Sequence, residues 1–146
     1  MATSTPEPEP APAEPVEPPG EGWGTGRRKS AVARVFLKPG TGKLLINKRE
    51  VDNYFTEEND RKQVLTAFEV CDQVGKWDTR INVGGGGHTG QAGAIRLGIA
   101  RALIKCSRPL EASIRAAGYL TCDARRVERK KYGQRGARRR FQFSKR

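Results

Sequence analysis

The sequence of 146 residues has little of what a metalloenzyme, a disulfide-bonded protein or a membrane protein needs. It contains one histidine, His88, and three cysteines, Cys71, Cys106 and Cys122, with no CxxC pair, so we expect neither a metal nor another cofactor. An odd number of widely spaced cysteines is a poor disulfide framework, and we expect reduced thiols that pack as small hydrophobes. A run of about 18 apolar residues is lacking, so the sequence predicts no membrane-spanning helix.

Bases are missing from the amino-terminal segment. Residues 1–22 are a low-complexity stretch of Pro, Glu and Ala, and such a composition predicts an extended, disordered arm. The arm either shields a basic surface before a partner arrives or is an extension without a specific role. It resembles neither a signal peptide nor an arginine-rich transit peptide, so we expect a cytoplasmic protein.

Acids are scarce in the rest of the chain. The formal net charge is +12, but residues 1–24 hold five Glu and no base, so residues 25–146 carry +17. Residues 125–146 contain eleven Lys or Arg against one acid, Glu128, with Tyr132, Phe141 and Phe143 among them. No apolar period runs through this segment, so we expect a basic tail that gains order on a polyanion, with RNA as the first candidate. The alternative is a mobile tail with only non-specific affinity.

Hydrophobic periodicity predicts an α/β domain with the helices on one face of a single sheet, in the two-layer α+β arrangement. We expect a hairpin of strands 30–38 and 43–48 around the turn 39–42, a helical turn at 50–55, a helix at 57–70, a strand at 77–83, and helices at 89–106 and 109–117. The predicted organisation is a disordered arm at 1–22, a globular domain at 23–122 and an extended tail at 123–146.

The same periodicity predicts which side chains are buried. For strand 77–83 and the helices at 57–70 and 89–106, the inward-facing residues are Trp77, Thr79, Ile81 and Val83, then Val64, Leu65 and Phe68, then Ile95, Ile99, Ala102 and Leu103. Gly118 is expected to end the last helix.

Two segments have the composition of phosphate-binding sites. The glycines at 84–87 lie between a predicted strand and a predicted helix, where backbone N–H groups can approach a phosphate. Tight packing of the helix on the sheet explains Gly90, Gly93 and Gly98 equally well. Three consecutive bases, Arg27, Arg28 and Lys29, stand at the entrance to the first predicted strand and are typical of a phosphate clamp or of a solvated face. His88 is expected to be a surface or capping residue.

These residues occur in motifs that resemble those of ribosomal protein nine of the bacterial small subunit. The motifs are TGRRKS at 25–30 with ARV at 33–35, GGG at 84–86 with GQAGAIR at 90–96, DAR at 123–125 with VERKK at 127–131, and QFSKR at 142–146. The resemblance covers residues 23–146 in order. Phe141 stands where the family usually has proline, and Gln134 and Gly136 replace a more apolar and a more basic residue.

The resemblance implies a four-stranded sheet with two helices packed on it, as in the second domain of ribosomal protein five. It implies a structural component of the small ribosomal subunit that binds the head, or 3′ major domain, of the ribosomal RNA (rRNA), beside neighbouring head proteins. It also implies a tail that threads through the head to the tRNA in the P site. No small-molecule substrate or membrane is expected.

Carried over to this chain, the tRNA contacts are Ser144, Lys145 and Arg146. The expected rRNA contacts are Arg27, Arg28, Lys29, Gly84, Gly85, Gly86, Gln91, Arg96, Arg125, Arg126, Arg129, Lys130, Lys131, Arg135, Arg138, Arg139 and Arg140.

Two other functions fit part of the composition. A free-standing basic nucleic-acid-binding protein would explain the charge. A small phosphotransferase would use the glycine loop, but its candidate carboxylates, Asp72, Asp78 and Asp123, have no supporting spacing.

Overall fold

Five strands form one mixed sheet within residues 20–145, which are the residues that the computed structural model describes. The strands are β1 (Gly22–Arg28), β2 (Ala31–Pro39), β3 (Leu44–Ile46), β4 (Arg49–Glu50) and β5 (Trp77–Gly84). Their order across the sheet is β1-β2-β5-β3-β4, and all neighbours are antiparallel except β3 and β5. The four strands that the resemblance implied are therefore five, the additional one being the two-residue β4.

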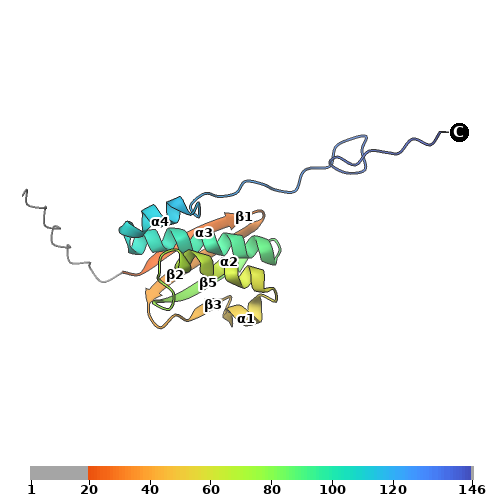
Figure 1. Ribbon diagram of the computed structural model, residues 1–146. Helices are drawn as coiled ribbons and strands as arrows, with labels where there is room; N and C mark the ends of the chain where they lie inside the picture. Colours follow the sequence, from red (N-terminus) through yellow and green to blue (C-terminus); the bar gives the residue numbers. More distant parts are fainter. Residues whose placement is uncertain (1–19, 146) are drawn as a thin grey trace, which may run out of the picture.

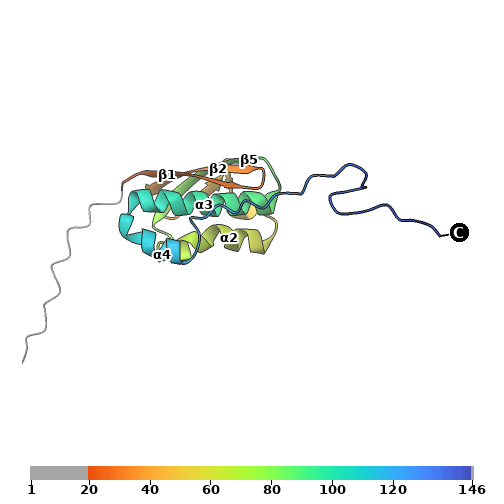
Figure 2. The same ribbon diagram turned by 90° about the horizontal axis from the view of Figure 1, so that it is seen from above.

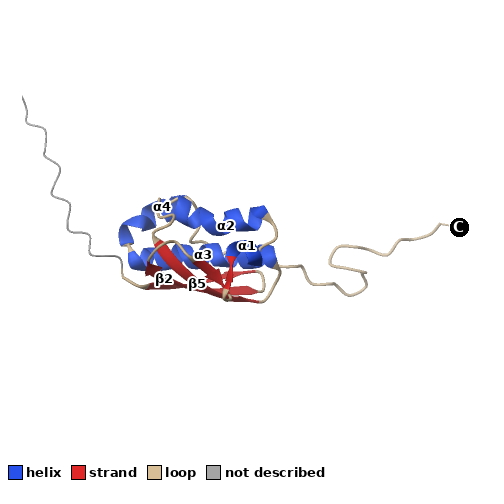
Figure 3. Cartoon of the chain, turned by 90° about the horizontal axis from the view of Figure 1, so that it is seen from below, coloured by secondary structure: helices blue, strands red, loops and turns tan. Residues whose placement is uncertain are grey.

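The helices lie on one side of this sheet (Figures 1–3). They are α1 (Val51–Tyr54), α2 (Glu58–Glu69), α3 (His88–Cys106) and α4 (Glu111–Ala116), the last preceded by a 3-10 turn at Arg108–Leu110. Figures 2 and 3 show α3 directly on the sheet, with α2 and α4 on the far side of α3. None of the helices in residues 20–145 has the length and apolar character needed to span a membrane.

The strand β1 was not expected from the sequence. Residues 24–30 were interpreted as a charged entrance to the first strand, but Gly22–Arg28 is itself a strand that pairs with β2 in register from Gly22–Leu37 to Arg28–Ala31. Glycine has low β propensity, which hides such a strand from pattern reading. Its buried positions are all glycines, and they face α3.

The expected hairpin of β2 and β3 is wrong, because β5 pairs with both strands and lies between them. The turn after β2 is held in place by a side chain of β5, Asp78. One carboxylate oxygen of Asp78 accepts hydrogen bonds from the backbone N–H groups of Lys43 (3.0 Å) and Thr41 (2.9 Å). These donors, Lys43 first, hold the pKa of Asp78 below its usual value. The composition of the turn therefore predicted that the chain reverses there, but not which strand is the neighbour of β2 in the sheet.

The core lies between the sheet and the helices and agrees with the expected inward faces except at one residue. Val64 and Phe68 are buried on α2, but Leu65 is 36% exposed, so its predicted burial is wrong. Only the narrow stripe of α2 that faces α3 is covered, and Leu65 is 100° away from Val64 around the helix. The inward residues predicted for β5 and α3 are all buried.

Helix α3 approaches β1 and β2 closely because α3 and β1 present glycines at the contact. A Cβ on Gly98 would stand 2.7 Å from Cγ2 of Val35, and one on Gly24 would stand 2.7 Å from the backbone nitrogen of Ala102. Packing thus accounts for Gly98, the most tightly enclosed of the three α3 glycines considered from the sequence.

The three cysteines are free thiols. Cys71 is buried and Cys106 is half-buried, and burial raises the pKa of both thiols. Cys122 is exposed, so the expectation of a packed hydrophobe is wrong there.

Candidate nucleic-acid interface

The glycine loop, residues 84–87, lies against the turn between β1 and β2. Gly85 has φ +80°, and a Cβ there would stand 2.5 Å from the carbonyl oxygen of Ser30. Lys29, in the turn, also has a positive φ of 53°. The turn between β1 and β2 and the glycine loop thus lie together beside the start of α3. Arg27, Lys29 and the loop glycines are exposed there, and Arg28 is half-buried.

The amino terminus of α3 follows this loop directly. Its N-cap residue is Gly87, which has no side chain to bond the free backbone N–H groups of the first turn, and no acid lies in that turn. These donors and the helix dipole favour an anion. His88, the first residue of the helix, is exposed, with its ring centroid 6.1 Å from those of Tyr54 and Phe55.

Gln91 holds the glycine loop in place. Its side-chain nitrogen donates to the carbonyl oxygen of Gly85 (3.1 Å), and its side-chain oxygen accepts from the hydroxyl of Tyr54 (2.7 Å). Gln91 was expected to contact RNA, and the structure shows its amide engaged inside the protein. Tyr54 was not singled out from the sequence, since nothing in the pattern of the helical turn at 50–55 relates it to residue 91.

Arg96 is also engaged within the protein. Its guanidinium lies 4.8 Å from the ring centroid of Tyr119, and the side chain is half-buried. It lines a hollow of about 220 Å³ shared with Arg27, Arg28 and Arg125. Four expected rRNA-binding arginines therefore meet in one polar depression.

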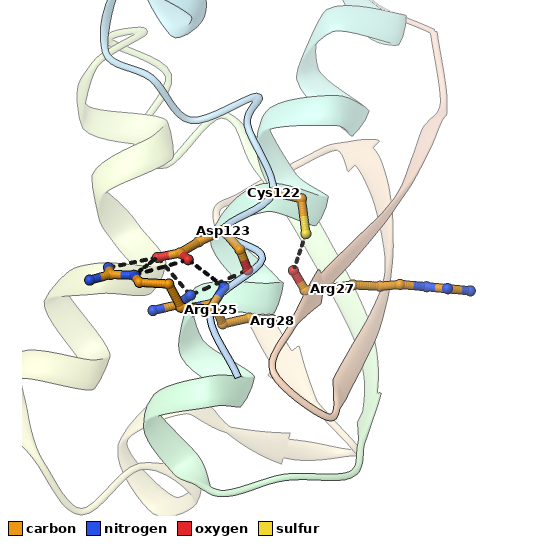
Figure 4. A network of polar contacts seen from close by, with 5 residues as sticks. All are labelled: Arg27, Arg28, Cys122, Asp123 and Arg125. Carbon is orange, nitrogen blue, oxygen red and sulfur yellow. Dashed lines mark hydrogen bonds and ion pairs between the residues drawn. The ribbon is translucent and has the colours of Figure 1, made fainter. Parts of the chain in front are cut away.

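Asp123 fixes the start of the tail to this end of the domain (Figure 4). Its carboxylate forms an ion pair with Arg28 (2.7 Å) and another with Arg125 (2.7 Å). The thiol of Cys122 donates to the carbonyl oxygen of Arg27 (3.1 Å). The hydrogen bonds from Arg125, then the one from Arg28, hold the pKa of Asp123 far below its usual value, so the carboxylate stays charged.

Beyond this attachment, residues 124–145 form no helix or strand and run away from the sheet in both ribbon views (Figures 1 and 2). Glu128, the one acid here, pairs with Lys131 (2.9 Å) and Arg138 (2.9 Å) and closes a loop. The donation from Arg138, followed by that from Lys131, lowers the pKa of Glu128. A backbone bond from Arg135 N to Arg139 O (3.0 Å) lies inside the loop.

Two of the three departures from the expected family pattern, Gln134 and Gly136, fall inside this loop, and the third, Phe141, follows it. The guanidinium of Arg135 lies 5.2 Å from the ring centroid of Phe141, and Gly136 is bonded through both its N–H and its carbonyl. Gln134 is half-buried. Phe141 and Gly136 therefore take part in contacts that hold the bend of the tail.

The structure divides the expected contacts into two groups. The first group, at the end of the domain, comprises Arg27, Arg28, Lys29, Gly84, Gly85, Gly86, Gln91, Arg96 and Arg125. The second follows the tail and comprises Arg126, Arg129, Lys130, Lys131, Arg135, Arg138, Arg139, Arg140, Ser144 and Lys145, all exposed except the half-buried Lys131. Arg146 lies outside the described residues.

An α/β domain with a cluster of bases beside a helix amino terminus and a basic segment projecting from the same end defines a nucleic-acid-binding protein. The carboxylates expected of a phosphotransferase are not assembled, since Asp78 holds a turn and Asp123 is paired with arginines. The family model described as Ribosomal protein S9/S16 matches residues 26–146. The chain belongs to that family.

Membership identifies the chain as a structural ribosomal protein of the small subunit, with rRNA and other ribosomal proteins as partners. The family is one of structural proteins and not of enzymes, and it acts in the cytoplasm as part of the ribosome. The resemblance read from the four motifs is thereby confirmed, and neither the phosphotransferase nor the free-standing nucleic-acid-binding protein is retained.

Proposed function

We propose that the chain binds rRNA of the small-subunit head, the 3′ major domain, and that the tip of its tail contacts tRNA in the P site. The observation that carries the proposal is the attachment of the tail. The ion pair of Arg28 with Asp123 holds the start of the tail at the end of β1, near the first turns of α3, so one end of the domain presents both basic surfaces together.

The end of the domain is suited to the RNA backbone. Arg27 and Lys29 are exposed, the loop glycines carry no side chains, and the first turn of α3 offers free N–H groups. Such contacts position a protein on phosphates without reading sequence, and each one releases counterions. We infer that Gln91 supports this surface by holding Gly85, and that Arg96 and Arg28 contribute charge from the polar depression.

The tail divides into an anchor and a tip. Residues 125–140 hold nine of its bases and serve as the anchor along rRNA, where counterion release offsets the entropy of ordering the segment. Ser144 and Lys145 are exposed at the far end, and with Arg146 they form the tip that contacts the tRNA backbone. A contact with phosphates alone suits a site that receives every tRNA. The neighbouring partners on the domain are other head proteins.

Two deletions test the division. Removing residues 144–146 should leave subunit assembly intact and weaken P-site tRNA binding, whereas removing residues 125–146 should also reduce association with head rRNA. Lys145→Gln is the matched variant of full length, and it should lower the dependence of tRNA binding on log salt by about one unit of slope. Lys62→Gln, an exposed lysine on α2, serves as the control.

The measurements are sedimentation with small subunits in high salt and tRNA binding to the assembled subunits. A short deletion that abolished assembly while tRNA affinity in assembled subunits stayed unchanged would contradict the role of the tip. A long deletion without effect on head-rRNA association would contradict the anchor.

A further inference from the structure

The face of the sheet turned away from α3 carries an uncovered row of aromatic and basic side chains, here called the open sheet face. Trp23 on β1 is paired with Phe36 on β2, Phe36 with Arg80 on β5, and Arg80 with Leu45 on β3. All four are exposed, because they alternate with the residues buried under α3. Figure 2 shows helices on only the other side of the sheet.

This row forms the floor of a shallow hollow of about 660 Å³. Lys38, Lys43 and Arg80 line the hollow together with two acids, Glu21 and Asp78. Both acids already have partners, since Glu21 pairs with Lys38 (2.8 Å) and Asp78 accepts backbone N–H groups. The five charged side chains of the hollow therefore sum to one positive charge, beside an apolar floor.

The positive character continues along β2 toward the glycine loop. Arg34 lies on the same face as Phe36, next to Asn82 of β5, and both line a second hollow of about 360 Å³. Val32 extends the face to Gly84, its partner on β5. The open sheet face thus joins an aromatic end to a basic end that reaches the glycine loop.

The aromatic groups are arranged for stacking. Trp23 is 59% exposed, and the ammonium of Lys105 stands 3.4 Å from its ring centroid. The guanidinium of Arg80 lies over the ring of Phe36 at 5.3 Å. Unpaired bases stack on aromatic rings and on guanidinium planes, whereas paired bases inside a duplex are not available for such contacts.

We propose that the open sheet face binds a single-stranded segment of RNA, with Trp23 and Phe36 as stacking surfaces and Arg34 and Arg80 as phosphate or stacking contacts. The aromatic end of this site lies apart from the surface formed by the glycine loop and the tail, although its basic end reaches Gly84. Trp23 lies five residues along β1 from Arg28, which is about 17 Å. Binding at the open sheet face would add recognition of unpaired bases to a protein whose other proposed contacts are made to the RNA phosphate backbone.

Tryptophan fluorescence tests the proposal at this face alone. The chain has two tryptophans, and Trp77 is only 5% exposed, so quenching by RNA reports on Trp23. Titration of the full chain with single-stranded oligouridylate should quench the emission in step with binding, which is followed separately by anisotropy of labelled RNA. Duplex RNA of the same length should bind through phosphates without that quenching.

Two pairs of variants sharpen the result. Phe36→Leu should weaken binding of the single strand about fivefold or more, since a stacked base contributes that much or more. Val74→Ala, at an exposed apolar residue outside the open sheet face, should have no effect. Arg80→Gln should act like Phe36→Leu, and Lys62→Gln should not. Circular dichroism establishes whether each variant is folded. If Phe36→Leu is unfolded, the binding of single-stranded RNA by Arg80→Gln tests the proposal in its place.

Equal emission with single-stranded and duplex RNA, or a Phe36→Leu variant that binds like Val74→Ala, would overturn the proposal. In intact small subunits, ultraviolet cross-linking should leave nucleotide adducts on peptides containing Trp23 or Phe36. Chemical cross-links from Lys38 or Lys43 to another protein without such adducts would assign the face to a protein partner instead. Deletion of residues 125–146 should leave the quenching of Trp23 in place, so failure here is distinct from failure of the proposed function.

Discussion

Replacing Gly26 by alanine is expected to destabilise the domain strongly although the substitution adds one methyl group. A Cβ at this position would overlap the carbonyl oxygen of Ala94 and stand 2.5 Å from the backbone nitrogen of Gly98, where ordinary contacts begin at 3.4 Å. Both atoms belong to the backbone of α3 and cannot rotate away. The strand and the helix must therefore separate by about 1 Å along a tightly packed contact.

The magnitude follows from overpacking of a close-packed interior, which costs about 1–3 kcal/mol and sometimes more. For a domain of this size, that cost corresponds to a fall in Tm of roughly 5–20 °C. The assay is urea denaturation followed by circular dichroism, with the midpoint and the slope fitted together. An unchanged slope with a lowered midpoint would show that the native state itself has lost stability.

Gly84→Ala is the matched control. Gly84 ends β5 and has no atom within 4 Å of an added Cβ, so the same substitution there should change the stability by less than about 0.5 kcal/mol. If Gly26→Ala were as stable as Gly84→Ala, the glycines of β1 would not be required by the approach of α3, and the reasoning would be refuted. Under the proposed function, Gly84→Ala should instead weaken RNA binding while the fold is kept.

Three further outcomes are expected. Asp123→Asn should release the start of the tail and speed tryptic cleavage there while the domain stays folded. The same release should appear in the native protein as the pH falls from about 4 toward the lowered pKa of the Asp123 carboxyl. A carboxylate with a depressed pKa stabilises the folded state only while it is charged. Cys122 should react with a thiol reagent at once, and Cys71 only on unfolding, which mass spectrometry of the labelled peptides measures. Gln91→Leu should loosen the glycine loop and lower rRNA affinity several-fold without unfolding the domain, as measured by filter binding beside circular dichroism.

Periodicity was sufficient to predict the elements whose burial follows one simple pattern. β5 alternates along its whole length and α3 carries a clear apolar stripe, so both were found with their inward faces. β1 was missed because its buried side consists of glycines. These glycines are required by the close packing of α3, a helix about 70 residues later in the chain. The order of strands was also beyond local reading, since insertion of β5 between β2 and β3 depends on pairing that turn residues do not encode.

The candidate site could likewise be predicted only in part from the sequence. Arginines and glycines could be marked as RNA contacts from composition and motif, but the partners that hold them were not apparent. Asp123 was recognised as part of a motif, and its ion pairs with Arg28 and Arg125 became evident only from the fold. Tyr54 supports Gln91 from a distant segment, and no spacing in the sequence relates the two.

The place of β5 in the sheet has a consequence for the order in which the chain can fold during synthesis. Within the sheet, β3 and β4 are joined to β1 and β2 only through β5, and β1 gains its cover only from α3. A nascent chain that ends before Trp77 therefore has two separate strand pairs, β1–β2 and β3–β4, and no complete sheet. Non-local pairing of this kind slows folding. The domain closes only after α3 has been made, and the basic tail, which follows α4 in the chain, is synthesised after every strand of the sheet.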